Sequence, residues 1–192
     1  MQKSQIRSLT LGAILTALVL VLQVLGSFIH LGPFSISLVL VPIILGAAAC
    51  NAFVGAWLGF VFGVAVLLSG DAAAFLAVDV WGTVLTVLFK GTLCGLAAGL
   101  VYKALKNINS TVAVFVAAVV CPVVNTGVFL IGCRLFFYET ITQWGLALGF
   151  ANAADYMFFG LAGGNFLFEL GVNLVLAPAV LRIMKIAFKR FN

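Results

Sequence analysis

Residues 9–29 read LTLGAILTALVLVLQVLGSFI and contain no charged side chain. A helix crosses the hydrocarbon core of a bilayer with about 20 apolar residues, each adding about 1.5 Å of rise. The stretch is longer than the apolar part of a secretion signal, which is about 7–15 residues, and no clear cleavage site of small residues follows it. We therefore expect it to form a first membrane-spanning helix, which sets the class of the fold.

The composition of the whole chain agrees with this stretch. Of its 192 residues, 65% are hydrophobic and 8% are charged, and the mean hydropathy is +1.29. Soluble domains average about 45–50% apolar and about 25% charged residues, and a small one leaves too much surface in water to hide so many apolar side chains. The composition predicts an all-α membrane protein in which residues 1–192 form a single transmembrane domain, with no soluble domain.

Glycines, prolines and charge clusters divide the remaining sequence into further apolar segments. The second segment is short, contains Pro42 and joins the third almost directly, near Asn51. We expect a compact bundle of about six transmembrane helices, at residues 6–29, 35–50, 51–69, 81–104, 110–136 and 161–187.

Residues 137–160 separate the last two of these segments. Connections beyond about 12–15 residues are usually functional or disordered, and this one contains Trp144, Phe150 and Tyr156, which argues against disorder. We expect a short helical or re-entrant cap.

The charged residues orient the bundle. With six spans both ends of the chain lie on one side of the membrane, together with most of the basic residues, and the positive-inside rule makes that side cytoplasmic. These basic residues are Lys3, Arg7, Lys103, Lys106, Arg182, Lys185, Lys189 and Arg190. The opposite loops hold Asp71, Asp79, Glu139 and Asp155. We expect a multi-pass protein of the plasma membrane with cytoplasmic termini, whose net charge of +5 reflects topology rather than nucleic-acid binding.

Several motifs of enzymes and metal sites are missing from the sequence. It has no GxxxxGK[ST] phosphate loop and no HExxH or GxSxG motif. The only histidine, His30, falls in an outer loop. The cysteines lie in apolar stretches without CxxC spacing, so we expect buried thiols rather than disulfides or metal ligands. They are Cys50, Cys94, Cys121 and Cys133. We predict no enzymatic activity, no metal and no cofactor.

Three charged residues fall within the outward halves of the predicted helices: Lys90, Arg134 and Glu169. A charge at the centre of a membrane helix costs about 2.5–3.5 kcal/mol on insertion scales, so such residues usually face a cavity or a partner. One alternative is a structural ion pair of Glu169 with Lys90 or Arg134, the other cation reaching the membrane surface. If both cations face Glu169, one positive charge is in excess, which suggests a carboxylate or phosphate on a ligand.

Polar residues form stripes beside these charges. Asn165, Glu169 and Asn173 recur every four residues and so share a helical face. Thr83, Thr86 and Lys90 share another, and Asn125 follows Pro122 in the next helix. Each asparagine alone is explained equally well by an interhelical contact. Together the stripes predict a cavity open to the outside, to which the cap contributes Trp144 and Tyr156. Its predicted lining is Lys90, Asn125, Arg134, Asn165, Glu169, Asn173, Trp144 and Tyr156.

The first predicted helix carries small residues near its cytoplasmic end: Gly12, Ala13, Thr16 and Ala17. Small residues four positions apart let another helix approach closely. That helix belongs either to a partner subunit or to the chain itself.

Three segments carry a resemblance to a known family: AILTA at residues 13–17, GPFSISLVLVPI at 32–43 and GAWLGFVFG at 55–63. With its basic ends and outward polar pocket, the chain resembles the substrate-binding S-component of energy-coupling-factor (ECF) vitamin transporters. The resemblance extends over nearly the whole chain.

The resemblance implies a mechanism and partners. An S-component captures a water-soluble vitamin from outside and docks on a membrane scaffold subunit driven by two cytoplasmic ATPases, forming an ABC-type importer. It then tips to deliver the ligand inward. The docking motif of the family maps to Ala13 and Ala17. The family pocket maps to the loops at 27–34 and 70–80, the cap at 137–160 and the outer halves of the last three helices.

Two substrates follow from these expectations. Excess positive charge suits the carboxylate of pantothenate, which we expect first. Riboflavin comes second, because Trp144 and Tyr156 could stack on its flat ring. Two rival functions remain at this stage. A self-sufficient small transporter or channel is often built from an inverted repeat, which we do not find in the sequence. A structural membrane-assembly protein would tolerate replacement of Lys90 and Glu169 together by apolar residues, because buried ion pairs are often dispensable.

Overall fold

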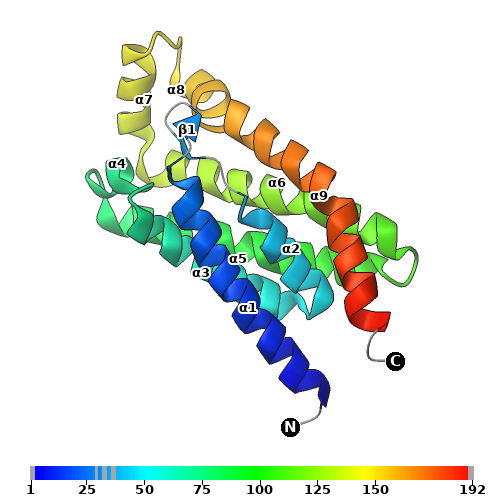
Figure 1. The fold of residues 1–192 in the computed structure, drawn as a ribbon. Helices are drawn as coiled ribbons and strands as arrows, with labels where there is room; N and C mark the ends of the chain where they lie inside the picture. The colour runs from blue at the N-terminus through cyan, green and yellow to red at the C-terminus, as the bar shows by residue number, and fades with distance from the viewer. Residues whose placement is uncertain (1–2, 29, 32–33, 36–37, 190–192) are drawn as a thin grey trace.

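A computed structural model describes residues 3–28, 30–31, 34–35 and 38–189. Arg190 and the loop positions 29, 32 and 33 lie outside the described residues. Six helices form the bundle that makes up most of the molecule (Figure 1). They are α1 (Lys3–Gly26), α2 (Leu40–Ala49), α3 (Ala52–Ser69), α5 (Val80–Leu105), α6 (Ser110–Phe136) and α9 (Gly164–Lys189).

Among the described residues, five helical segments are long and apolar enough to cross a membrane. They are Ser8–Gly26, Ala52–Ser69, Val80–Leu105, Ser110–Phe136 and Ala153–Met184, with Leu40–Ala49 as a shorter apolar helix. The predicted all-α membrane bundle is therefore confirmed. The short helix α2 covers only about half the thickness of the membrane core, because its ten residues extend about 15 Å.

The short helix α2 lies inside the bundle. Eight of its residues are buried, from Leu40 to Ala48, and it contacts α1, α3, α5, α6 and α9. A helix that is apolar on every side belongs in a protein interior. It begins at Leu40 rather than at residue 35, so Pro42 lies in its first turn, where the missing backbone N–H breaks no helical hydrogen bond.

Polar caps set where three of the long helices begin. The side chain of Asn51 accepts a hydrogen bond from the backbone N–H of Val54 at 3.0 Å, and Asp79 accepts one from Trp81 at 3.0 Å. Asn109 accepts two, from Thr111 at 2.8 Å and from Val112 at 3.2 Å. These bonds satisfy N–H groups that have no partner within the helix.

Helices α3 and α5 pack antiparallel through facing glycines. A Cβ atom added to Gly59 would collide with the carbonyl oxygen of Gly91, and one added to Gly91 would collide with that of Gly59. Gly55 and Gly95 stand in the same relation one turn along. Such close backbone approach is typical of small-residue contacts between membrane helices. It also holds the neighbouring side chains of α3 and α5 close together.

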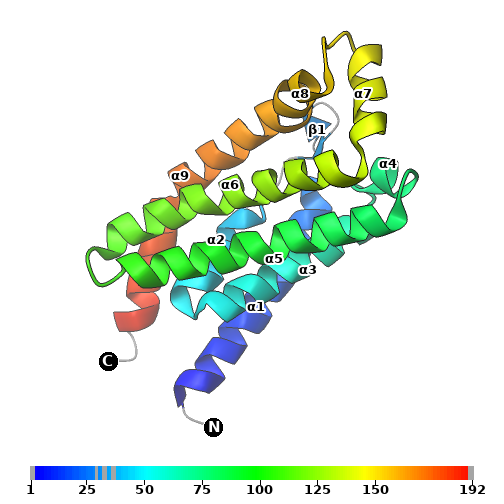
Figure 2. The same ribbon diagram turned by 180° about the vertical axis from the view of Figure 1, so that it is seen from behind.

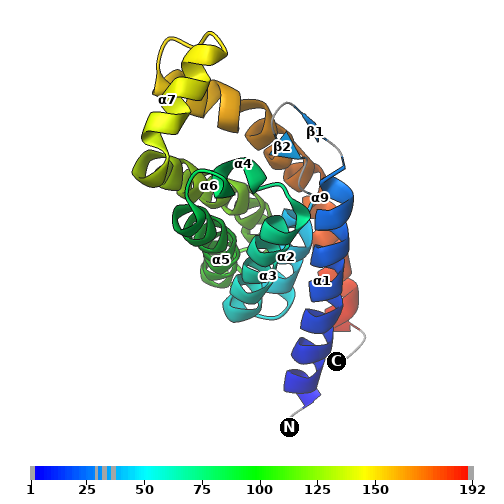
Figure 3. The same ribbon diagram turned by 90° about the vertical axis from the view of Figure 1, so that its left-hand side faces the viewer.

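The two ends of the molecule differ. The start of α1 and the end of α9 lie at one end, together with the α2–α3 and α5–α6 connections (Figures 1 and 2). The other end carries the short elements (Figure 3). These are the β1–β2 hairpin (His30–Leu31 and Phe34–Ser35), α4 (Ala73–Leu76), α7 (Tyr138–Ala147), α8 (Ala153–Asp155) and the π-helix η1 (Tyr156–Gly163). The prediction of a helical cap over residues 137–160 is thus confirmed.

Candidate functional site

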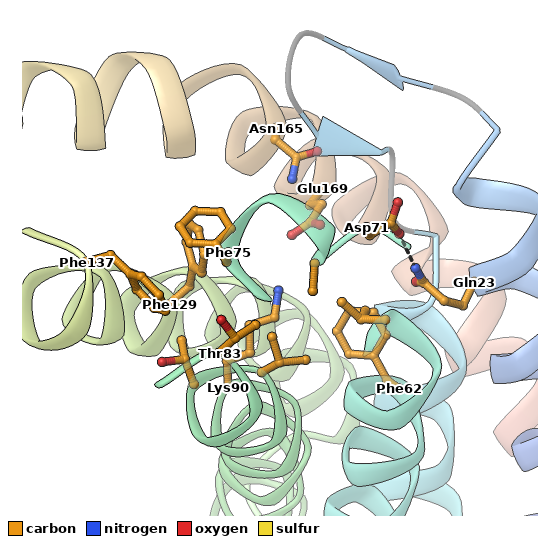
Figure 4. A pocket seen from close by; sticks show the side chains of 14 residues that line it. Gln23, Phe62, Asp71, Phe75, Thr83, Lys90, Phe129, Phe137, Asn165 and Glu169 are labelled. Atoms are coloured by element: carbon orange, nitrogen blue, oxygen red, sulfur yellow. Dashed lines mark hydrogen bonds between the residues drawn. The ribbon is translucent and has the colours of Figure 1, made fainter. Parts of the chain in front are cut away.

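A cavity lies below the hairpin and α4, between α3, α5, α6 and α9 (Figure 4). The space in it that a water molecule can occupy is about 70 Å³, within about 630 Å³ of space between the side chains that is partly open to solvent. Its polar lining is Gln23, Asp71, Thr83, Thr86, Lys90, Asn165 and Glu169. Its apolar lining is Phe62, Val66, Ala72, Phe75, Val87, Phe129 and Phe137.

The ammonium group of Lys90 lies at the centre of this lining. It is 5.7 Å from the ring centroid of Phe62 and 5.3 Å from that of Phe129. A cation within about 6 Å of an aromatic face is attracted by the ring quadrupole. Glu169 and Asp71 are the carboxylates whose charges act on it, and Figure 4 shows the Glu169 side chain facing Lys90 across the cavity. Two aromatic rings thus lie beside the cation, and the charges of two carboxylates act on it.

Four buried polar atoms around the cavity have no hydrogen-bond partner among the described residues. They are Thr86 Oγ1, Asn125 Oδ1, Asn165 Oδ1 and Glu169 Oε2. Glu169 is only 3% exposed, and the side chain of Asn125 approaches its carboxylate from α6. A buried polar atom left unpaired costs about 1–3 kcal/mol, so four of them at one place require an explanation. A ligand that donates hydrogen bonds would satisfy them.

A hydrogen-bonded cluster closes one side of the cavity. Gln23 of α1 donates to Ser69 Oγ at 3.3 Å and also to Asp71. Ser69 Oγ in turn donates to Asp71 at 3.2 Å. Gln23 is 3% exposed, so the cluster fixes α1 to the turn that follows α3 and orients Asp71 in the cavity wall (Figure 4).

The structure brings part of the predicted site together. Lys90, Asn165 and Glu169 line the cavity, and Asn125 contacts it through Glu169. Asn173 is 3% exposed and lies one turn further along α9, outside the lining.

Arg134 lies outside the cavity. It is exposed at the end of α6, where its guanidinium stacks on the ring of Tyr138 at 4.4 Å from the centroid. Five positions separate it from Phe129, a rotation of about 140° around the helix, so the two side chains face in different directions. The cavity therefore has one cation and two carboxylates in its lining, and the expected excess of positive charge is absent from it.

The two predicted cap residues also lie behind the lining. Trp144 packs edge-on against Phe75 with the ring centroids 5.5 Å apart. Tyr156 is 4% exposed and packs on Phe150 at 5.2 Å. The aromatic rings in the lining are instead those of Phe62, Phe75, Phe129 and Phe137.

Sequence reasoning missed Gln23 and these four phenylalanines. Gln23 had a usable signal, because it is the only amide side chain within the apolar stretch 9–29. The phenylalanines had none, since the chain contains 18 of them and most membrane-facing positions are equally apolar.

The small-residue face of α1 divides into an inner and an outer part. Gly12 is buried and faces Val54 of α3, whereas Ala13 and Ala17 are exposed. The Trp57 indole of α3 donates a hydrogen bond to Thr16 Oγ1 at 3.2 Å, so an aromatic side chain borders the exposed alanines. Gly12 therefore serves packing within the chain, and Ala13 and Ala17 are left exposed on α1.

Comparison with known proteins gives one match. The sequence model of a protein family described as "ECF transporter, substrate-specific component" matches residues 7–181. No match was found among curated proteins, and none among solved structures.

Proposed function

The chain belongs to the family of substrate-specific components of ECF transporters, and we propose that it captures a water-soluble vitamin in the cavity around Lys90 and Glu169. Members of this family bind small molecules and work with a membrane scaffold and ATPase subunits. The observation that carries the proposal is the group of four unpaired buried polar atoms beside aromatic rings. A ligand with hydrogen-bond donors would supply the missing partners.

The chemistry of the cavity favours a planar ligand that bears hydrogen-bond donors. Asn125 Oδ1, Asn165 Oδ1 and Glu169 Oε2 accept hydrogen bonds, and the phenylalanine rings suit a flat ring system. Riboflavin combines an uncharged flat ring with a chain of hydroxyl groups, so we place it first. Pantothenate, which the sequence placed first, becomes the second candidate. Its carboxylate would pair with Lys90, but Glu169 and Asp71 oppose a further anion.

Docking and orientation complete the proposal. Ala13 and Ala17 are exposed in the middle of α1, and the first residues of this helix lie at the end of the molecule that carries both termini (Figure 1). We place that end on the cytoplasmic side of the plasma membrane, where the basic residues gather. The scaffold subunit then packs against the two alanines, and two ATPases supply the energy for which the chain has no phosphate loop.

A binding panel tests the proposal. Purified protein in detergent is titrated with riboflavin, pantothenate and other water-soluble vitamins, and binding is measured by calorimetry or by quenching of riboflavin fluorescence. We expect riboflavin to bind with a Kd below the micromolar range. Binding of pantothenate instead would reverse the order of the two substrates. If no vitamin binds below the micromolar range, the proposed function is wrong.

A further inference from the structure

A second hollow lies at the end of α6 and is separate from the central cavity. It encloses about 730 Å³, part of it open to solvent, and shares no lining residue with the cavity. Leu130, Ile131 and Leu135 of α6 form one wall, and Met157 and Phe158 of η1 form the other. We call this hollow the α6–η1 groove. Its walls are apolar apart from the side chains of Arg134 and Tyr138, where α6 meets α7.

The α6–η1 groove is exposed on the outside of the bundle, at the end of α6. Ile131, Leu135 and Phe158 are 60%, 69% and 60% exposed. Helix α6 has 27 residues, which gives a length of about 40 Å against about 30 Å for the hydrocarbon core. Its last turn therefore extends to the level of the lipid headgroups. Arg134 lies in that turn.

Arg134 supplies an unpaired cation at that depth. The face of its guanidinium is covered by Tyr138 at 4.4 Å, which leaves the N–H groups at its edge available. Among the described residues no ion pair joins Arg134 to a carboxylate. Asp155, next to the groove residue Ala154, is held by Asn152 through two hydrogen bonds of 2.9 Å. A planar fork of N–H donors matches the geometry of a phosphate group.

We propose that the α6–η1 groove binds an anionic phospholipid. The phosphate pairs with Arg134, and an acyl chain lies along Ile131, Leu135 and Phe158. The charge favours a lipid such as phosphatidylglycerol over phosphatidylcholine, whose choline group already balances its phosphate. This inference does not depend on what the central cavity binds.

Native mass spectrometry of delipidated protein tests it. Wild type, Arg134→Gln and the matched control Lys106→Gln are given equal amounts of phosphatidylglycerol and phosphatidylcholine, and the bound lipids are counted. Lys106 is also an exposed cation but lies in the α5–α6 connection. We expect wild type and Lys106→Gln to prefer phosphatidylglycerol, and Arg134→Gln to lose about fivefold of that preference, which corresponds to about 1 kcal/mol per basic residue at a membrane surface.

Two further arms keep the test decisive if Arg134→Gln is unstable. Ala154→Phe fills the groove while keeping Arg134, and we expect it to displace the lipid. An excess of glycerol 3-phosphate should not displace it, because the acyl chain contributes to binding. The proposal is overturned if wild type shows no preference, if both groove variants retain the lipid, or if glycerol phosphate competes fully, which would indicate a site for soluble phosphates.

Discussion

At the scale of single residues, the strongest prediction is that Glu169 contributes to ligand binding. Its carboxylate has one unpaired buried oxygen beside the cavity. A hydrogen bond to a charged group contributes about 1.5–3 kcal/mol, so Glu169→Gln should weaken riboflavin binding about 10- to 100-fold. Titration of fluorescence quenching measures the Kd. Gly171→Ala is the matched control, because it lies on the same helix and an added Cβ meets nothing within 4 Å. Equal Kd values for the two variants would remove Glu169 from the binding site.

Lys90 and Glu169 are expected to depend on each other. Lys90→Met leaves the buried Glu169 without the cation that faces it across the cavity (Figure 4), and a buried charge without compensation is strongly destabilising. We expect a clear fall in the thermal stability of Lys90→Met in detergent. The double variant Lys90→Met/Glu169→Leu should recover stability but not ligand binding. A double variant that still bound ligand would mean that Lys90 and Glu169 have only a structural role.

The sequence predicted polar cavity residues better than apolar ones, for a physical reason. Polar side chains such as Lys90, Asn165 and Glu169 are costly in a membrane and therefore informative. A phenylalanine side chain costs little free energy on any face of a membrane helix, so the sequence does not distinguish Phe62 from phenylalanines that face lipid. Arg134 was assigned to the cavity from its depth in the membrane. The direction in which a side chain points around its helix also decides which residues it meets.

At the scale of elements, the contact between α3 and α5 is expected to tolerate no side chain. Gly59→Leu would force the backbones apart at Gly91, and overpacking costs typically about 1–3 kcal/mol. We expect reduced expression and a lower unfolding temperature, together with weaker ligand binding, because the contact holds Phe62 beside Lys90. Gly127→Ala is the control, since an added Cβ there meets nothing within 4 Å. A Gly59→Leu variant as stable as Gly127→Ala would contradict the close packing.

The elements themselves were predictable where length and hydropathy decide. The five long spans follow from apolar runs of sufficient length. Two features do not follow from length and hydropathy. The central helix α2 is buried on all sides by its neighbours, which depends on tertiary contacts. The last helix begins at Gly164, after the π-helix Tyr156–Gly163, and a change from α to π winding leaves no mark on hydropathy.

At the scale of the whole molecule, the exposed alanines of α1 are expected to govern assembly. Ala13→Trp and Ala17→Trp should abolish co-purification with the scaffold subunit, because a large side chain prevents close helix approach. Ligand binding should be unchanged, since neither residue lines the cavity. Val123→Trp is the control, because Val123 is 47% exposed on a different helix, α6. If both alanine variants still co-purify with the scaffold, the docking surface lies elsewhere.

Energy supply separates the proposed function from its main rival. The sequence contains no phosphate loop, and a cavity alone can bind a ligand but cannot drive it against a gradient. Vesicles that contain only this chain should therefore retain at most about one riboflavin per protein, in proportion to binding. Vesicles that also contain the scaffold and ATPase subunits should accumulate riboflavin well beyond that ratio, and only with ATP. Accumulation by the chain alone would identify a self-sufficient transporter. Uptake against a gradient requires an energy source, and in that case the scaffold and ATPase subunits would not be supplying the energy.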